Sequence, residues 1–526
     1  MTAPLVVIAD ALHGHDAQAL AVADGRIVAI GDRADARAWT GVGTETLRVP
    51  GTVLPGLVDA HAHPILAARV SRGRDLRGVR TLDQLRETIA HERLRAAGGW
   101  VLGWGLEHAV WEGRTPNVDA VADAAGDAPM LLRMFDAHSA LASRAALELA
   151  GVREERTFAS GSCVEADATG RPTGFLREHE AIGLIERIVP SEPDAVVAAR
   201  LADQLADMAA SGLTGAHVMD FEGDPTALYD AVEDAGRMSL RLRIHPWVDP
   251  EMAPGDWERL VSETGTGGRL WRRHGVKFFL DGTVDNGTAW LCAPDCHGES
   301  LRSTWSSPAH YAAAIAHFAG HGVPTATHAI GDAAVRHAAA SIAAARAAYP
   351  GSVHRIEHLE LTGDDIVAEV AASGAVASMQ PTHVTRFVHA DGSDNWSERL
   401  GVRRAQQGWR TRSLVELGVT LALGSDWPIA PFDPREILAE AQTRSHGGRP
   451  PVQPAEALTA TQALAGYTAG AAAAAGVSSE EGRISVGMRA DLSVLSADPS
   501  TCSAAEVSSL AVHATIVDGL VRHRGI

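Results

Sequence analysis

The fold of this chain can be worked out from one stretch, Gly275-Val276-Lys277-Phe278-Phe279-Leu280-Asp281-Gly282. The run is short and apolar and ends in turn residues, which predicts a buried β-strand. Lys277 is the only lysine in the sequence, so every other residue among the 46 lysines and arginines is an arginine. A buried amine can lose its proton and react as a nucleophile, whereas a guanidinium keeps its charge. Lys277 is therefore a candidate functional residue.

One reaction open to such an amine is addition to carbon dioxide, which gives a carbamate that can bridge two metal ions as a carboxylate does. The simpler alternative is that Lys277 is structural and pairs with an acid, while the bias toward arginine reflects codon usage. The buried strand around Lys277 favours the functional interpretation.

Size and charge narrow the class of protein. A chain of 526 residues exceeds what one hydrophobic core usually covers, so we expect a large α/β barrel and a smaller unit. The net charge of −19 argues against nucleic acids and anionic membranes as partners, because both would repel the protein. No run reaches the about 18 apolar residues of a membrane-spanning helix.

The cysteines and the N-terminus indicate the compartment. Four cysteines are too few for a disulfide framework in a chain of this length, and a reducing compartment fits them. The first ten residues lack the basic region and the long apolar core of a signal peptide. We expect a cytoplasmic protein.

Both ends of the chain read as short strands joined by tight turns. Asp24-Gly25 and Asp518-Gly519 are favoured two-residue hairpin turns, and each separates two apolar runs. Because the middle of the chain has a different pattern, the ends predict one small β-sandwich built from residues 1–53 and 480–526.

The middle alternates apolar strands with alanine-rich helical stretches, which is typical of βα units around a parallel sheet. Eight strands are expected: Thr52–Asp59, Leu213–Met219, Leu240–Trp247, Gly275–Asp281, Val323–His328, Val353–Glu357, Ala375–Gln380 and Thr420–Gly424. Eight strands close a (β/α)8 TIM barrel, which we place at residues 54–479. The long gap after the first strand predicts an inserted subdomain at about 66–210, with helices at Thr81–Arg95 and Ser139–Ala150.

Polar residues stand where these strands end. Residues two apart on a strand share a face, so His61 and His63 point together. Catalytic groups of a barrel gather at the carboxyl ends of its strands, and imidazole and carboxylate are the usual ligands of zinc. Six residues at the strand ends therefore predict a metal site: His61, His63, Lys277, His328, His358 and Asp426.

This pattern resembles the amidohydrolase superfamily, and in particular amidohydrolase family 3, the YtcJ-like branch that includes N-substituted formamide deformylase. The resemblance covers nearly the whole chain. It rests on Pro55–His63, Gly103–Gly105, Asp136–Leu141, Val276-Lys277 with Asp281-Gly282, Thr327–Asp332, Arg355–His358 and Gly487–Leu492.

The resemblance implies a binuclear site, usually zinc. His61, His63 and Asp426 would hold one ion, His328 and His358 the other, and a carboxylated Lys277 would bridge the two. Asp426 would act as general base and then as general acid in hydrolysis by a metal-activated hydroxide, and His358 and Lys277 would also serve catalysis. Some members use a single metal, in which case Lys277 need not be carboxylated.

Further residues are candidates for contact with substrate. His138 in the insertion would polarise a carbonyl opposite the metals, unless it caps a helix beginning at Ser139. Asp281 would bind substrate or orient the carbamate, unless it caps the following loop. Trp104 and Trp427 fall where the mouth of the site is expected and would favour an aromatic or apolar substrate group, unless they only pack the insertion against the barrel.

The leading prediction is a hydrolase that cleaves a C–N bond of an amide, formamide or cyclic amide. A deaminase on the same site is the alternative within enzymes, and a non-catalytic scaffold of the same fold is the alternative outside them. A scaffold has no need for all six ligand positions. A serine hydrolase is disfavoured because the chain lacks a Gly-x-Ser-x-Gly motif. The expected partner is a small molecule, with a homodimer as one option for assembly.

Overall fold

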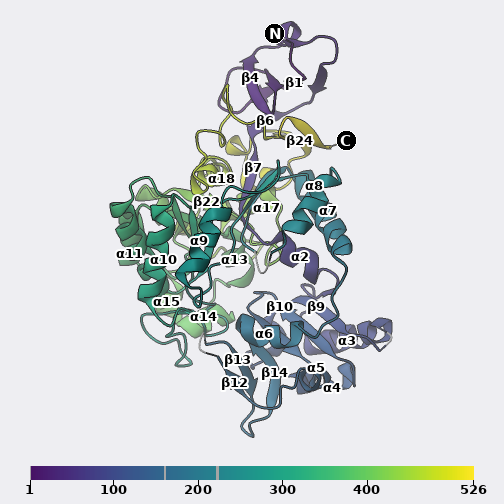
Figure 1. The fold of residues 1–526 in the computed structure, drawn as a ribbon, viewed down its shortest axis with the longest axis vertical. Coiled ribbons are helices and arrows are strands. Elements are labelled where there is room, and N and C mark those ends of the chain that lie inside the picture. Colours follow the sequence, from purple (N-terminus) through teal and green to yellow (C-terminus); the bar gives the residue numbers. More distant parts are fainter. Residues whose placement is uncertain (1, 97, 159–160, 221–223, 526) are drawn as a thin grey trace.

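The computed structural model describes residues 2–96, 98–158, 161–220 and 224–525. Three parts follow one another along the long axis of this mixed α/β molecule (Figure 1). A small β unit containing both termini lies at one end, a body of parallel strands and helices lies in the middle, and the inserted segment lies at the other end. No helix in the described ranges is long and apolar enough to cross a membrane.

The small β unit contains two sheets. The first has the order β4-β3-β1-β5, with β1 Leu5–Ile8, β3 Ala19–Ala23, β4 Arg26–Gly31 and β5 Glu45–Arg48. The second has the order β2-β6-β23-β24-β25, with β2 Ala11–Leu12, β6 Thr52–Pro55, β23 Leu492–Leu495, β24 Val512–Val517 and β25 Leu520–Arg524. Val7 of the first sheet and Ile516 of the second belong to one buried cluster. Both predicted hairpin turns are present, with positive φ at Asp24 and Asp518.

The body contains two parallel sheets. One has the order β17-β16-β15-β7, with β7 Leu57–Ala62, β15 Leu213–Val218, β16 Arg241–Ile244 and β17 Trp271–Arg273. The other has the order β18-β19-β20-β21-β22, with β18 Val276–Phe279, β19 Thr325–Ala329, β20 His354–His358, β21 Val376–Met379 and β22 Leu421–Leu423. Isolated parallel bridges link the two sheets: Trp247, beyond β16, pairs with Lys277 of β18, and Ala62 of β7 pairs with Trp427, beyond β22.

The first predicted strand is divided in the structure. Thr52–Pro55 pairs antiparallel with β23 in the small β unit, and only the chain after Gly56 enters the parallel sheet beside β15. Gly56 separates the two because the chain is crowded there: an added Cβ would lie 2.2 Å from Oγ1 of Thr214. A continuous apolar run does not reveal such a change of sheet.

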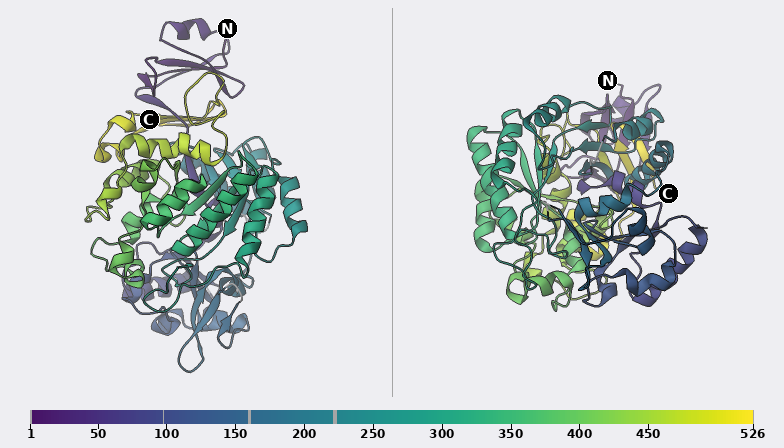
Figure 2. Two further views of the ribbon diagram at one scale, coloured as in Figure 1. Left: turned by 90° about the vertical axis from the view of Figure 1, so that its left-hand side faces the viewer. Right: turned by 60° about the horizontal axis from the view of Figure 1, so that its bottom comes forward.

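Helices cover the parallel sheets, as the turned view in Figure 2 shows for the green segment. Buried residues of most of these helices share one large cluster with the strands. The helices are α2 Pro64–Val70, α7 Asp194–Ala210, α8 Thr226–Asp234, α9 Pro254–Glu263, α10 Pro308–Gly320, α11 Asp332–Ala348, α12 Asp364–Ser373, α13 Pro381–Phe387, α14 Asn395–Leu400, α15 Val402–Ala405, α16 Thr411–Glu416, α17 Pro434–Thr443, α18 Ala460–Tyr467 and α19 Ala469–Ala474. Short helices α1 Asp35–Trp39 and α20 Ala504–Val507 lie near the termini.

The inserted segment has its own sheet, of order β12-β13-β14-β11-β10-β9-β8. Its strands are β8 Arg74–Asp75, β9 Val101–Leu106, β10 Met130–Met134, β11 Ser139–Ala142, β12 Arg156–Thr157, β13 Cys163–Ala166 and β14 Pro172–Arg177. Its helices are α3 Leu82–Ala96, α4 Ala122–Ala125, α5 Arg144–Leu149 and α6 Glu178–Glu186. The prediction of one helix over Ser139–Ala150 was wrong at its start. Ser143 caps α5 by accepting a hydrogen bond from the Ala146 N–H, so the helix begins only after it.

Candidate metal centre

His61 near the end of β7 and His63 just after that strand lie beside Asp426, which follows β22 by three residues. Nε2 of His61 lies 3.3 Å from Nε2 of His63. Oδ1 of Asp426 lies 2.9 Å from Nε2 of His63 and 3.3 Å from Nε2 of His61. His61, His358 and Asp426 offer ligand atoms that all lie within 4.8 Å of one another. The fold therefore brings together groups from strands that are distant in the sequence.

Three of the histidines are held by acceptors on one side of the ring. Nδ1 of His61 lies 2.6 Å from Oε2 of Glu357, and Nδ1 of His358 lies 2.9 Å from Oε1 of Gln380. Nε2 of His328 lies 3.1 Å from the Gly282 carbonyl oxygen. An acceptor takes the ring N–H, so the opposite nitrogen keeps its lone pair. This is the tautomer that binds a metal.

The ionisation of these groups fits the same role. Burial lowers the pKa of His61 to about 4 and lowers the pKa values of His328 and His358 well below their ordinary range. Burial alone would raise the pKa of Asp426, but His61 and His63 beside it lower that pKa below its ordinary value. At neutral pH His61, His328 and His358 are therefore neutral and Asp426 is ionised, which are the forms that coordinate metal ions.

Lys277 is buried in the same place. Its side chain is 1% exposed, and its Nζ has no hydrogen-bond partner among the described residues. Burial lowers the pKa of Lys277 to about 8. A buried polar atom without a partner costs free energy, so this amine fits a group that the chain itself does not provide.

His138 reaches the centre from the insertion. Its ring centroid lies 5.4 Å from that of His328, and its Nδ1 lies 2.8 Å from Oε2 of Glu178. Burial alone would lower the pKa of His138, but Glu178 raises it, to about 9. His138 is therefore a cation at neutral pH. The alternative that it caps a helix at Ser139 is wrong, because Ser139–Ala142 is a strand.

Asp281 caps loop backbone, which was the alternative to a role in binding substrate or orienting the carbamate. Its carboxylate accepts hydrogen bonds from the backbone N–H groups of Trp290, Ile330 and Gly331, at 2.8 to 3.0 Å. Oδ1 of Asp281 also lies 3.7 Å from Nε2 of His328. Asp281 thus ties two loops together beside the centre and is not among the described residues that line the cavity.

The cavity over the centre has a volume of about 490 Å³. Neither Trp104 nor Trp427 is among the described residues that line it. Their rings lie 6.1 Å apart, and the guanidinium of Arg77 lies over both. The aromatic residues that do line the cavity are Phe135, Trp247, Phe279, Phe387, Trp396 and Trp409.

Sequence reasoning missed several polar residues of the site. Glu357 and Gln380 end predicted strands, so their positions were a usable signal. His383 lies in α13, and its buried Nε2 has no hydrogen-bond partner among the described residues and is 3.6 Å from Oδ2 of Asp426. Glu178 comes from the insertion, and no pattern in the sequence indicated that it would lie at the site. With His138 and His179 it forms a second group of ligand-type atoms within 4.8 Å.

Comparisons with known proteins agree with this geometry. The model of the amidohydrolase family matches residues 51–523. The chain is 30% identical to N-substituted formamide deformylase from Arthrobacter pascens, over 96% of this chain and 95% of that protein. It is 27% identical to the putative amidohydrolase YtcJ of Bacillus subtilis, over 91% and 90%. An uncharacterized metal-dependent hydrolase from Pyrococcus horikoshii shares the fold, with a TM-score of 0.72 and 22% identity over 95% and 99%.

Proposed function

The chain belongs to the amidohydrolase family, and from this premise we propose that it hydrolyses an amide, formamide or cyclic amide. It is a metal-dependent hydrolase of carbon–nitrogen bonds other than peptide bonds. One observation carries the proposal: His61, His358 and Asp426 converge in a buried site where acceptors hold the histidines in the metal-binding tautomer.

We assign the metal ligands as follows. His61, His63 and Asp426 would hold one divalent ion, with zinc as the proposed metal, and His328 and His358 a second. A carboxylated Lys277 would bridge them, and its unpartnered, buried Nζ supports this assignment. If only one ion binds, Lys277 stays an amine. Bound metal would supply hydroxide at neutral pH and polarise the substrate carbonyl.

The protein's own groups would move the protons. Asp426, ionised at neutral pH, would accept the proton of the attacking water and donate it to the leaving nitrogen. His138, held as a cation by Glu178, would donate a hydrogen bond to the substrate carbonyl oxygen. The aromatic lining of the cavity supports a substrate with an aromatic or apolar group, and the similarity to a formamide deformylase supports a formamide.

We further propose that residues 54–479 form one closed (β/α)8 barrel, interrupted by an insertion at about 66–210, and that residues 1–53 and 480–526 form a β-sandwich. Backbone hydrogen bonds between the two parallel sheets support the barrel: Lys277 N–H donates to Pro246 at 2.9 Å, and His63 N–H donates to Trp427 at 2.7 Å. The core shared by the two terminal sheets supports the sandwich. The cytoplasmic location and the homodimer stay predictions.

Metal analysis of a Lys277→Arg variant tests the binuclear site. Arginine keeps the positive charge but cannot form the carbamate. We expect two metal ions per chain in the wild type, one or fewer in the variant, and a fall of at least about 100-fold in amide hydrolysis. In Lys277→Ala, added acetate supplies a free carboxylate and should restore part of the metal content. Full metal content and activity in Lys277→Arg would contradict the carbamate bridge.

A substrate panel tests the reaction class. N-formyl and N-acyl derivatives of aromatic amines would be compared with purines, and release of free amine would be compared with release of ammonia from the ring. Hydrolysis of the formyl amines supports the proposal. Ammonia release from purines, with no cleavage of the amides, would instead make the chain a deaminase on the same site.

A further inference from the structure

Glu360 and Asp285 are two of the acidic residues that line the cavity. Glu360 is 7% exposed, and its Oε2 accepts a hydrogen bond from Nε1 of Trp396 at 2.8 Å. Its other oxygen, Oε1, accepts no hydrogen bond from the residues the structure describes. Oε1 also retains some accessible surface, since it is absent from the fully buried atoms that have no partner. This oxygen is therefore open to the cavity.

Neighbouring residues of α14 hold the two acids. Asn395 donates to Oδ1 of Asp285 at 2.9 Å, and Trp396, the next residue, binds Glu360. Since the two donors are adjacent in the chain, Asp285 and Glu360 lie on the same wall of the cavity.

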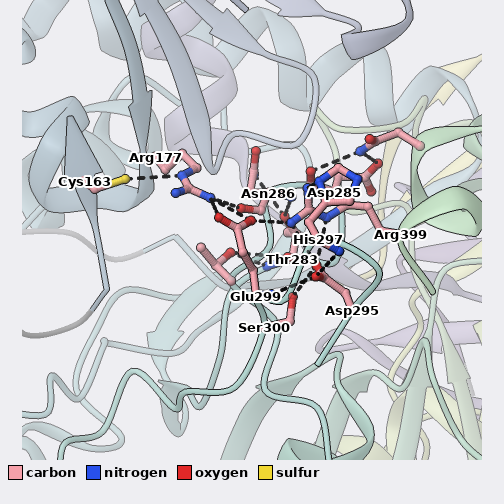
Figure 3. Close-up of polar contacts among 12 residues, drawn as sticks. Cys163, Arg177, Thr283, Asp285, Asn286, Asp295, His297, Glu299, Ser300 and Arg399 are labelled. Carbon is pink, nitrogen blue, oxygen red and sulfur yellow. Dashed lines mark hydrogen bonds and ion pairs between the residues drawn. The ribbon is translucent and has the colours of Figure 1, made fainter. Parts of the chain in front are cut away.

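The loop that carries Asp285 is fixed on both sides (Figure 3). Arg177 of the insertion donates to the Asn286 carbonyl oxygen at 2.7 Å, and Arg399 of α14 pairs with Asp295 and Glu299. Side chains of the insertion and of α14 therefore hold this loop.

The chain is bent at the last residue of β20 and the residue after it, next to Glu360. His358 and Leu359 both have positive φ, 73° and 50°, which is uncommon for residues other than glycine. As a result, His358 and Glu360 both line the cavity. Backbone strain of this kind is retained where a side chain must face a functional site.

Neither acid is in an ion pair, although the charge of His108 acts on Asp285 from farther away. Among the described residues no ion pair joins Glu360 or Asp285 to an arginine, lysine or histidine, whereas Arg72 and Arg133, which line the same cavity, pair with Glu192 and Glu186. A buried carboxylate without a cation is costly, so this wall is complementary to a positive charge.

Aromatic rings complete the surroundings of the two acids. Trp396 and Trp409 lie 4.5 Å apart between ring centroids, and Phe135 and Phe387 lie 4.3 Å apart. All four rings line the cavity. Aromatic faces attract cations as well as apolar groups, so these rings suit an apolar or aromatic substrate group that ends in a positive charge.

We propose that Glu360 and Asp285 form a subsite for an ammonium group of the substrate. The substrate would be an amide whose aromatic or apolar arm ends in a protonated amine. This inference rests on the proposed function only in that the cavity receives an amide substrate.

Calorimetric titration of the metal-loaded protein with three small probes tests the subsite. Benzylamine carries the ammonium group, benzyl alcohol has nearly the same shape without charge, and phenylacetate carries the opposite charge. We expect benzylamine to bind at least about tenfold more tightly than benzyl alcohol, as a charge-assisted hydrogen bond predicts. Glu360→Gln should remove this preference and Asp285→Asn should weaken it. Glu251→Gln, which removes an exposed acid, should leave the preference unchanged.

The variants also separate the subsite from its alternatives. An amine bound to the metal would be indifferent to Glu360, so a preference that survives in both Glu360→Gln and Asp285→Asn overturns the proposal. Equal binding of benzylamine and benzyl alcohol, or tighter binding of phenylacetate, overturns it too. If formamides are hydrolysed but the probes show no preference, the function stands and the subsite is wrong. If benzylamine binds through Glu360 but no amide is cleaved, the subsite stands and the proposed function fails.

Discussion

Oε2 of Glu357 lies 2.6 Å from Nδ1 of His61, and neither side chain has any exposed surface. The same carboxylate pairs with the buried guanidinium of Arg355, which also contacts Nδ1 of His217. Glu357 therefore has two functions at once. It holds the His61 ring in its tautomer, and it neutralises a charge inside the body of the protein.

Replacing Glu357 with glutamine should damage both metal binding and stability. Glutamine can still accept the His61 N–H, but it leaves Arg355 buried without an opposite charge. We expect the free energy of unfolding to fall by about 3 kcal/mol and metal affinity to fall about 10- to 100-fold. Urea unfolding and competition with a metal chelator measure the two. Glu369→Gln, which breaks an exposed pair with Arg336, should change the unfolding free energy by less than about 1 kcal/mol.

Gly282 couples the insertion to the metal centre. Its carbonyl oxygen lies 3.1 Å from Nε2 of His328, and a Cβ at this position would lie 2.2 Å from Oγ1 of Thr288 and 2.3 Å from Oε1 of Glu178. Gly282→Ala should therefore displace the carbonyl and weaken metal binding by about tenfold or more.

Metal content after dialysis against a buffered chelator measures this effect. Gly255→Ala is the matched control, since nothing lies within 4 Å of its Cβ position in α9 and alanine is favoured in helices. Equal metal retention in Gly282→Ala and the wild type would show that the carbonyl does not position His328.

Much of the site could be predicted because its residues follow short-range rules. His61 and His63 are two residues apart, which places them on one face of an extended chain. His358 is the last residue of β20 and His328 is the next-to-last residue of β19, both in the parallel sheet. These rules depend only on the order of residues along each strand, so they hold without knowledge of the tertiary contacts.

The rest depended on contacts between distant segments, which the sequence does not encode locally. Trp104 and Trp427 were placed near the mouth of the site, but they pack against each other and against Arg77. Glu360 enters the cavity only because two non-glycine residues before it have positive φ. Glu178 meets His138 only through the fold of the insertion.

The pair of His138 and Glu178 predicts a specific pH dependence. Glu178 raises the pKa of His138 to about 9, so the imidazole stays protonated across the neutral range. In Glu178→Gln this pKa should fall toward or below the ordinary value of about 6.5. If the His138 cation donates to the substrate carbonyl, activity falls where it loses its proton, and the alkaline limb of kcat/KM should move to lower pH in the variant. Glu148→Gln, at an exposed position in α5, should leave the limb in place. An unchanged limb in Glu178→Gln would remove His138 from the chemistry.

The ion pair between His13 and Asp498 joins the two ends of the chain and predicts a pH-dependent stability. Their nearest atoms lie 2.6 Å apart. Donating its ring N–H to Asp498 raises the pKa of His13. The stabilisation from His13 is therefore full below the unfolded pKa of about 6.5 and is lost as pH rises through the folded pKa. Although burial opposes it, the hydrogen bond from His13 lowers the pKa of Asp498 to about 2, so that contribution is lost as pH falls from about 4 toward about 2. The pair therefore stabilises the fold most between about pH 4 and 6.5.

His13→Gln should lower Tm clearly at pH 5 and much less at pH 9, as measured by scanning calorimetry. His91→Gln, which replaces an exposed histidine in α3, is the control. An equal loss of Tm at both pH values would mean that His13 contributes by packing and not by charge.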